Sequence, residues 1–127
     1  EVWLMDTKLK NFIINTLRRA SFRWKPRGEA KKRYKVQVGE FKTGRAKYGY
    51  RCAMCDEVFK SKDVKMDHII PAVPLEGWQG FDVFIERMFC DEEGFQCLCD
   101  TCHDEKTKEE KDIRMKHRKE KKSLDKD

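Results

Sequence analysis

The chain has 127 residues, of which 41% are charged and 39% hydrophobic, which predicts one domain whose core needs an additional staple. No segment approaches the roughly 18 consecutive apolar residues of a membrane span, so no membrane-embedded segment is expected. The net charge of +6 is unevenly distributed: residues 1–50 carry 14 basic and 4 acidic side chains, whereas residues 51–103 carry 5 and 11. This segregation favours one region that holds a polyanion and another that holds cations, and surface lysines alone explain it less well.

The first twelve residues, EVWLMDTKLKNF, contain no uncharged apolar core followed by a small-residue cleavage site, so no signal peptide is predicted. The four residues before Met5 are interpreted as an addition to a native start at Met5. Without a signal peptide the expected location is the cytoplasm, where cysteines stay reduced and more often bind metals than form disulfides.

Two helices are predicted in the first third of the chain. Residues 6–21 carry an apolar stripe at helical spacing and a candidate cap, Asp6 or Thr7. Pro26 and Gly28 interrupt the pattern, and residues 29–38, EAKKRYKVQV, then predict a short basic helix. The stretch from Gly39 to Gly49 is expected to be a loop.

The rest of the chain alternates predicted strands and helices. Residues 50–59, YRCAMCDEVF, predict a strand, a tight turn and a return strand, and residues 64–70, VKMDHII, predict another strand. Residues 71–80 are rich in proline and glycine and cannot continue it. An amphipathic helix is expected from Phe81 to Phe89, and a charged helix from about Asp100 to Lys122, with a polar far end that projects into solvent.

Two CxxC pairs are the strongest motif in the sequence, and 43 residues separate them: Cys52 and Cys55, then Cys99 and Cys102. Each CxxC turn brings two thiolates to one metal, so together the pairs predict a tetrahedral structural zinc site. Disulfides or free thiols are the alternatives. A site closed by four thiolates has no open position for catalysis, so any chemistry must occur elsewhere. Cys90 and Cys97 need no role beyond that of small apolar side chains.

Asp67 and His68 are adjacent in the predicted strand 64–70, so their side chains point to opposite faces. His103 directly follows Cys102, and closure of the zinc site would carry it toward that strand. The bland alternatives are a structural Asp–His hydrogen bond and a surface histidine.

The order CxxC, then DHIxP, then LCxxCHxxKT, over residues 48–110, resembles the HNH endonucleases of the ββα-metal class, in the zinc-stapled form common among bacteriophages. The resemblance implies an α+β fold with a ββα-metal core at residues 48–110. A basic helical extension over residues 1–47 would precede this core, and a charged helix or tail over residues 111–127 would follow it. It further implies a metal-dependent hydrolase that nicks or cleaves DNA phosphodiester bonds during phage genome processing.

The resemblance also implies roles for individual residues. Asp67 and His103 would hold one divalent cation, and His68 would be the general base. Thr107 stands where some members have a further histidine ligand, and two protein ligands suit Mg2+ or Mn2+ better than catalytic zinc. Lys106 fits the family pattern and would approach a phosphate, or would be an ordinary exposed lysine.

One position departs from the family pattern, because Gly94 stands where a middle asparagine is expected. Glu93 and Gln96 are the candidate replacements for its side chain. An asparagine introduced at Gly94 is expected to brace the general base and to raise the rate.

Residues 18–35 mix basic and aromatic side chains, and they predict phosphate contacts that are insensitive to DNA sequence. The expected DNA-binding residues are Arg18, Arg19, Lys31, Lys32 and Arg33. A solvated helix face over core aromatics is the alternative.

The expected partner is DNA, with phage packaging or replication proteins implied by the resemblance, in the host-cell cytoplasm and with a monomer favoured. Two other functions are kept open. One is a zinc-dependent nucleic-acid-binding module without catalysis, and the other is a zinc-stabilised protein-interaction domain.

Overall fold

The structure is a computed structural model of the chain, and it describes residues 5–125. The four residues that precede Met5, interpreted above as an addition, lie outside the described residues. None of the described helices is both long enough and apolar enough to cross a membrane.

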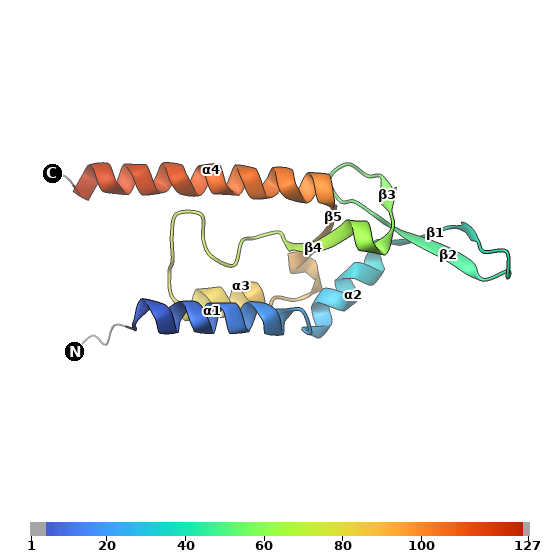
Figure 1. Cartoon of the computed structure of the whole chain (residues 1–127), viewed down its shortest axis with the longest axis horizontal. Coiled ribbons are helices and arrows are strands. Elements are labelled where there is room, and N and C mark those ends of the chain that lie inside the picture. The colour runs from blue at the N-terminus through green and yellow to red at the C-terminus, as the bar shows by residue number, and fades with distance from the viewer. Residues whose placement is uncertain (1–4, 126–127) are drawn as a thin grey trace.

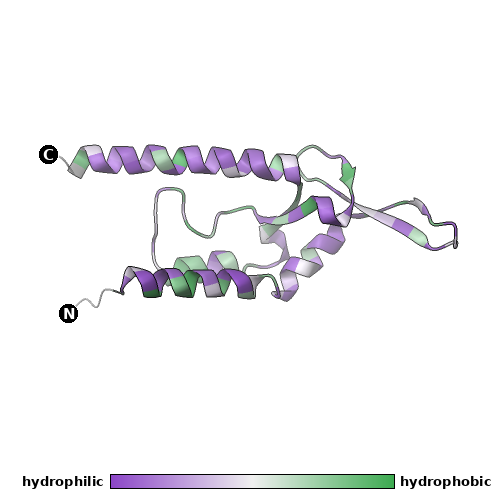
Figure 2. Cartoon of the chain, viewed as in Figure 1, coloured by the Kyte–Doolittle hydropathy of each residue, from purple (hydrophilic) through white to green (hydrophobic). Residues whose placement is uncertain are grey.

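Helix α1 (Thr7–Ser21) begins where the sequence predicts, because the Asp6 carboxylate accepts the Lys8 backbone N–H at 3.3 Å. Ile14 and Leu17 of its apolar stripe pack against a buried cluster that includes Phe84 and Met88 of helix α3 (Phe81–Met88). The two helices lie side by side (Figure 1), and both carry hydrophobic residues (Figure 2). The buried centre of this contact consists of Ala72, Phe84 and Met88.

The predicted basic helix over residues 29–38 is wrong in its position. Helix α2 (Lys25–Arg33) starts earlier, because Pro26 lies in its first turn, where a missing N–H costs nothing. After Arg33 the chain turns into strand β1 (Lys35–Glu40), whose valines favour an extended backbone.

The loop predicted between Gly39 and Gly49 is also wrong, since much of it is strand β2 (Ala46–Arg51), paired antiparallel with β1. The expected domain boundary between residues 47 and 48 falls inside this strand.

Two small antiparallel sheets organise the centre of the molecule. The first has the order β1-β2-β3, in which β3 (Val58–Phe59) is the predicted return strand after the first CxxC turn. A short 3-10 turn, η1 (Ser61–Asp63), leads to the second sheet, in which β4 (Val64–His68) pairs with β5 (Phe95–Cys99). The register places Asp67 opposite Gln96 and His68 opposite Phe95.

The second sheet leads directly into helix α4 (Asp100–Asp125), which contacts both of its strands. A 3-10 turn, η2 (Glu92–Gly94), precedes β5. Strands β4 and β5 and helix α4 pack together as one unit. The α+β prediction is confirmed at this level. Helix α4 is mostly hydrophilic, as predicted (Figure 2), and its middle is tied to the 71–80 loop by Arg114, which donates to the Val73 and Pro74 carbonyls at 2.8 and 3.2 Å.

We expect Leu98→Ala to lower the free energy of unfolding by about 2–5 kcal/mol, because Leu98 is fully buried beside the cysteines and leaves a cavity when truncated. Leu124→Ala is the matched control, since this leucine is 76% exposed, and its effect should stay within about 0.5 kcal/mol. Urea unfolding at a fixed zinc concentration measures both. Equal effects of the two substitutions on the free energy of unfolding would show that burial of Leu98 does not stabilise the fold as expected.

Candidate metal centre and active site

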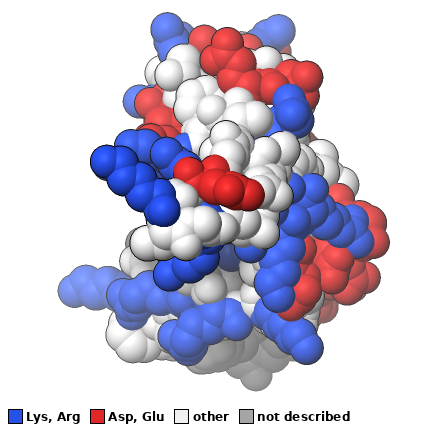
Figure 3. Space-filling view, turned by 90° about the vertical axis from the view of Figure 1, so that its right-hand side faces the viewer, with Lys and Arg blue, Asp and Glu red and all other residues white. Residues whose placement is uncertain are grey.

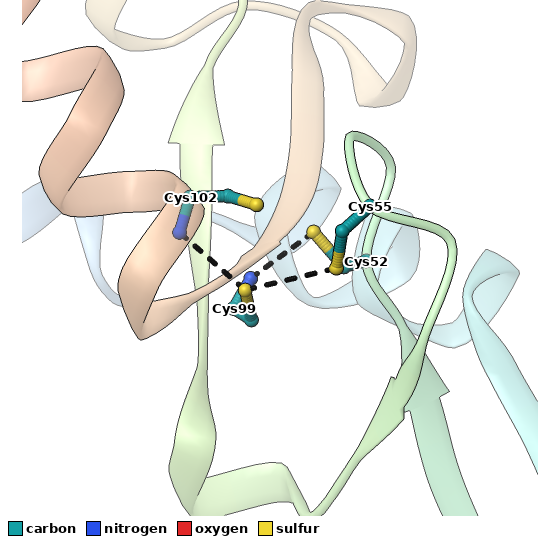
Figure 4. Close-up of side chains that lie close together, drawn as sticks. All are labelled: Cys52, Cys55, Cys99 and Cys102. Atoms are coloured by element: carbon teal, nitrogen blue, oxygen red, sulfur yellow. Dashed lines mark hydrogen bonds between the residues drawn. The ribbon is translucent and has the colours of Figure 1, made fainter.

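Four cysteine side chains converge where the two sheets meet (Figure 4). Cys52 and Cys55 lie in the turn between β2 and β3, whereas Cys99 ends β5 and Cys102 lies in the first turn of α4. The 52–55 turn is joined to β5 by a hydrogen bond, in which the Ala53 N–H donates to the Cys97 carbonyl at 2.7 Å. The sequence-predicted pairing of the two CxxC motifs is therefore present in the fold.

The four sulfur atoms all lie within 4.8 Å of one another, and the Cys55 and Cys99 sulfurs are 3.9 Å apart. A tetrahedral zinc ion with bonds of about 2.3 Å would separate its sulfurs by roughly 3.8 Å. The cluster is thus compatible with a structural zinc site.

The surroundings of the cluster favour a thiolate at Cys52, but they oppose ionisation of Cys102. Burial opposes ionisation of Cys52, yet backbone N–H donors outweigh it and lower its pKa to about 6. The neighbouring Cys99 sulfur, together with burial, raises the pKa of Cys102 to about 12. A divalent cation among the four sulfurs removes this conflict, since its charge stabilises every thiolate.

Cys90 and Cys97 lie outside the cluster, as expected. Burial raises the pKa of Cys97 to about 11, and burial also raises the pKa of Cys90. Both side chains therefore stay protonated at neutral pH and fill space.

Asp67 points toward the start of α4, on the opposite face of β4 from His68. Its Oδ2 atom accepts hydrogen bonds from Lys106 Nζ and from Gln96 Nε2, the latter at 3.2 Å. Its Oδ1 atom lies 3.9 Å from His103 Nε2. That separation is too long for a hydrogen bond.

His103 has an unusual environment for a surface histidine. Its Nδ1 atom is buried and has no hydrogen-bond partner among the described residues, and the nearest acidic oxygen, on Asp104, is 3.9 Å away. An unpaired buried ring nitrogen is unfavourable, so a bland structural role does not explain this position.

His68 makes its contacts on the other face of β4. Its Nε2 atom lies 2.9 Å from the Met88 carbonyl, and its ring packs on Phe95 with centroids 4.8 Å apart. A carbonyl only accepts, so Nε2 carries the proton and Nδ1 carries the lone pair. Burial lowers the pKa of His68, which keeps the ring neutral at pH 7.

Lys106 is not the ordinary exposed lysine of one sequence interpretation. It is only 17% exposed, and it bonds to the Asp67 carboxylate, to the His68 carbonyl at 2.8 Å and to Glu110. Its position three residues after His103, on the same side of α4, is the one sequence signal that would have placed it there.

Gly94 braces the end of β4 through its backbone, because its carbonyl accepts the Ile69 N–H at 2.9 Å. A Cβ atom at this position would lie 2.4 Å from the Cys90 sulfur, so the expected rate gain from an asparagine here is not supported. Of the candidate replacements, Glu93 pairs with Arg33, and Gln96 supports Asp67.

A cleft of about 710 Å³ runs between helices α1 and α2 and strand β4, and it brings the three predicted active-site residues together. Its lining includes Asp67, His68 and His103 together with the basic residues Arg18, Arg27 and Lys31.

The five residues predicted to bind DNA are divided by the fold. Arg18 and Lys31 line the cleft, whereas Arg19 does not. Lys32 pairs with Glu29 at 3.3 Å. Arg33 pairs with two acids of the 92–94 turn, Glu92 at 2.6 Å and Glu93 at 3.3 Å.

Sequence reasoning missed Arg27, which joins the helices to strand β4. Its guanidinium donates to the Met66 carbonyl and to the Ser21 carbonyl, each at 3.1 Å. It also lies between the rings of Phe22 and Phe95, at 5.0 and 5.1 Å from their centroids. No spacing rule distinguishes it from the neighbouring basic residues.

Comparison of the chain with protein-family models, with curated proteins and with solved structures found no match.

We expect the purified protein to contain about one tightly bound Zn2+, and Cys52→Ser and Cys102→Ser to lose it together with the fold, because zinc binding would contribute directly to folding. Cys90→Ser is the control and should keep both. Elemental analysis and circular dichroism make the test. Zinc-free protein that folds normally would contradict it.

Proposed function

We propose that this chain is a metal-dependent DNA endonuclease of the HNH, ββα-metal class, as its motifs imply. The observation that carries the proposal is the meeting of Asp67, His68 and His103 in one cleft lined by basic side chains. The three residues come from a strand and a helix that follow the order of the family motifs.

Asp67 Oδ1 and His103 Nε2 are the two atoms that would hold the catalytic cation. Their proximity, 3.9 Å with no hydrogen bond between them, supports this assignment. When bound, a Mg2+ or Mn2+ ion would neutralise charge on the scissile phosphate and its leaving oxygen. Gln96 keeps the carboxylate in place from β5.

His68 is the proposed general base, and its surroundings support that role. The Met88 carbonyl holds the Nε2 proton, which leaves the Nδ1 lone pair free to take a proton from a water molecule. The ring stays off the cation because strand alternation directs it away from Asp67.

The four cysteines are proposed to bind a structural zinc ion that fixes the position of the residues around it. Zinc would hold Cys102 against the 52–55 turn, and the next residue, His103, would then be fixed beside Asp67. Arg18 and Lys31, which line the cleft, are proposed to contact DNA phosphates.

A nucleic-acid-binding module without catalysis is the second candidate, and one contact favours it. The Lys106 ammonium group already neutralises the Asp67 carboxylate, in the place where a divalent cation would act. A cation must therefore compete with Lys106 for Asp67.

His68→Ala should reduce plasmid nicking in Mg2+ or Mn2+ by at least about a hundredfold, the usual scale for loss of a general base. His117→Ala, on the exposed part of α4, is the control and should retain full activity. Both variants should keep zinc, fold and DNA affinity. A wild type that binds DNA but does not nick it would favour the second candidate, and a fully active His68→Ala would overturn the base assignment.

Lys106→Met should strengthen Mn2+ binding at the Asp67–His103 pair by about tenfold or more, because it removes a like charge in a partly buried site. Lys108→Met, on an exposed position of the same helix, is the matched control. Paramagnetic titration of the zinc-loaded protein measures both. Unchanged Mn2+ affinity in Lys106→Met would show that Lys106 and the cation do not share Asp67.

A further inference from the structure

The β1–β2 hairpin extends away from the rest of the molecule as a two-stranded ribbon (Figure 1). At its base the Arg51 N–H donates to the Tyr34 carbonyl at 2.9 Å, and β3 pairs only with Tyr50 and Arg51. From Lys35 to Gly49, the two strands of the ribbon pair only with each other in the described part of the chain. Such a ribbon contributes little to folding by itself, so its length calls for another explanation.

The ribbon exposes aromatic and apolar side chains that belong to neither core cluster. Val38, Phe41 and Tyr48 are 50%, 48% and 47% exposed. Two of the rings carry cations on their faces: Lys35 Nζ lies 4.2 Å from the centroid of Tyr48, and Lys47 Nζ lies 5.7 Å from that of Phe41.

The charge of the ribbon is strongly positive. Residues 35–51 contain five basic residues, and Glu40 is the one acidic residue among them. Lys42 and Arg45 lie in the exposed turn, where a hydrogen bond between Phe41 and Arg45 closes the hairpin at 2.8 Å. The tip therefore presents exposed positive charge.

We infer that this hairpin is an arm that inserts into the major groove of duplex DNA. The major groove of B-form DNA is about 12 Å wide and about 8.5 Å deep, and it admits a two-stranded ribbon. A six-residue strand spans about 20 Å, so the outer half of the hairpin is long enough to reach the groove floor. Lys42, Arg45 and Lys47 would then contact the flanking phosphates.

The basic surface continues from the hairpin to the cleft. Lys31, which lines the cleft, places its Nζ atom 4.8 Å from the ring centroid of Tyr50, at the base of the ribbon. Figure 3 looks onto this end of the molecule and shows Lys and Arg side chains across its middle and lower parts, with acidic side chains at the centre and to the right. The choice of DNA as the partner rests on the proposed function. Binding by the arm does not require cleavage of the DNA.

The test compares binding of a 20-base-pair DNA duplex and an RNA duplex of the same sequence, without added divalent cation, over a range of salt concentrations. The first variant is Lys42→Gln/Arg45→Gln/Lys47→Gln. Its matched control is Lys116→Gln/Arg118→Gln/Lys119→Gln, which removes the same charge from the exposed part of α4. A-form RNA has a deep, narrow major groove that would not admit the ribbon, so it serves as the control for shape.

The hairpin variant should bind DNA at least tenfold more weakly, and its salt dependence should fall by about two to three phosphate contacts. The α4 control should change by less than threefold, and the two variants should bind RNA equally. Equal losses on DNA and RNA, or in both variants, would overturn the inference.

A second variant keeps the test independent of the charge changes. It replaces residues 38–47 by Asn-Gly, which closes the hairpin directly at the Gln37–Tyr48 pair with a two-residue turn. This variant should lose the same DNA affinity as the triple variant while keeping its zinc and circular dichroism spectrum. Full DNA affinity in this folded variant would also overturn the inference. Because nicking is not scored, an inactive nuclease would leave this result unaffected.

Discussion

The convergence of four cysteine sulfurs is the constraint on which the rest of the structure depends. It joins the turn after β2 to the junction of β5 and α4, two segments separated by more than forty residues. The buried side chains around it are few, with Leu98 at their centre. Since a chain this polar has little apolar surface to bury, this contact, together with the hydrogen bonds from Lys106 and Arg114, fixes the position of α4 and hence of His103.

Strand β4 shows how two opposite environments arise from adjacent residues. Asp67 faces a polar group of Gln96, Lys106 and His103, whereas His68 packs on Phe95 and bonds to the Met88 carbonyl. The first environment stabilises negative charge, and the second disfavours a charged imidazole. For the proposed nuclease, one strand would therefore supply both a carboxylate for the cation and a neutral base for the proton.

Local patterns predicted the parts of the fold that depend on local interactions. The Asp6 cap, the apolar stripe of α1 and the paired CxxC turns act within one element or through one specific bond type. The strand over residues 35–40 was missed because the basic run before it suits a helix, and pairing with β2 decides where that helix ends. Lys106 and Arg27 were misjudged or missed for the same reason: each acts on a residue about forty positions away.

Helix α4 separates the residues near Asp67 from its own tail. At about 1.5 Å per residue, the 26-residue helix is about 39 Å long, and it is held at its start by the cysteine cluster and about 18 Å farther on by the hydrogen bonds from Arg114. His103 and Lys106 lie between these two points, and Lys106 is only about 6 Å along the axis from Cys102. Two anchors resist a tilt that a single pivot would allow, so a force on the last residues bends the helix beyond Arg114 before it displaces Lys106.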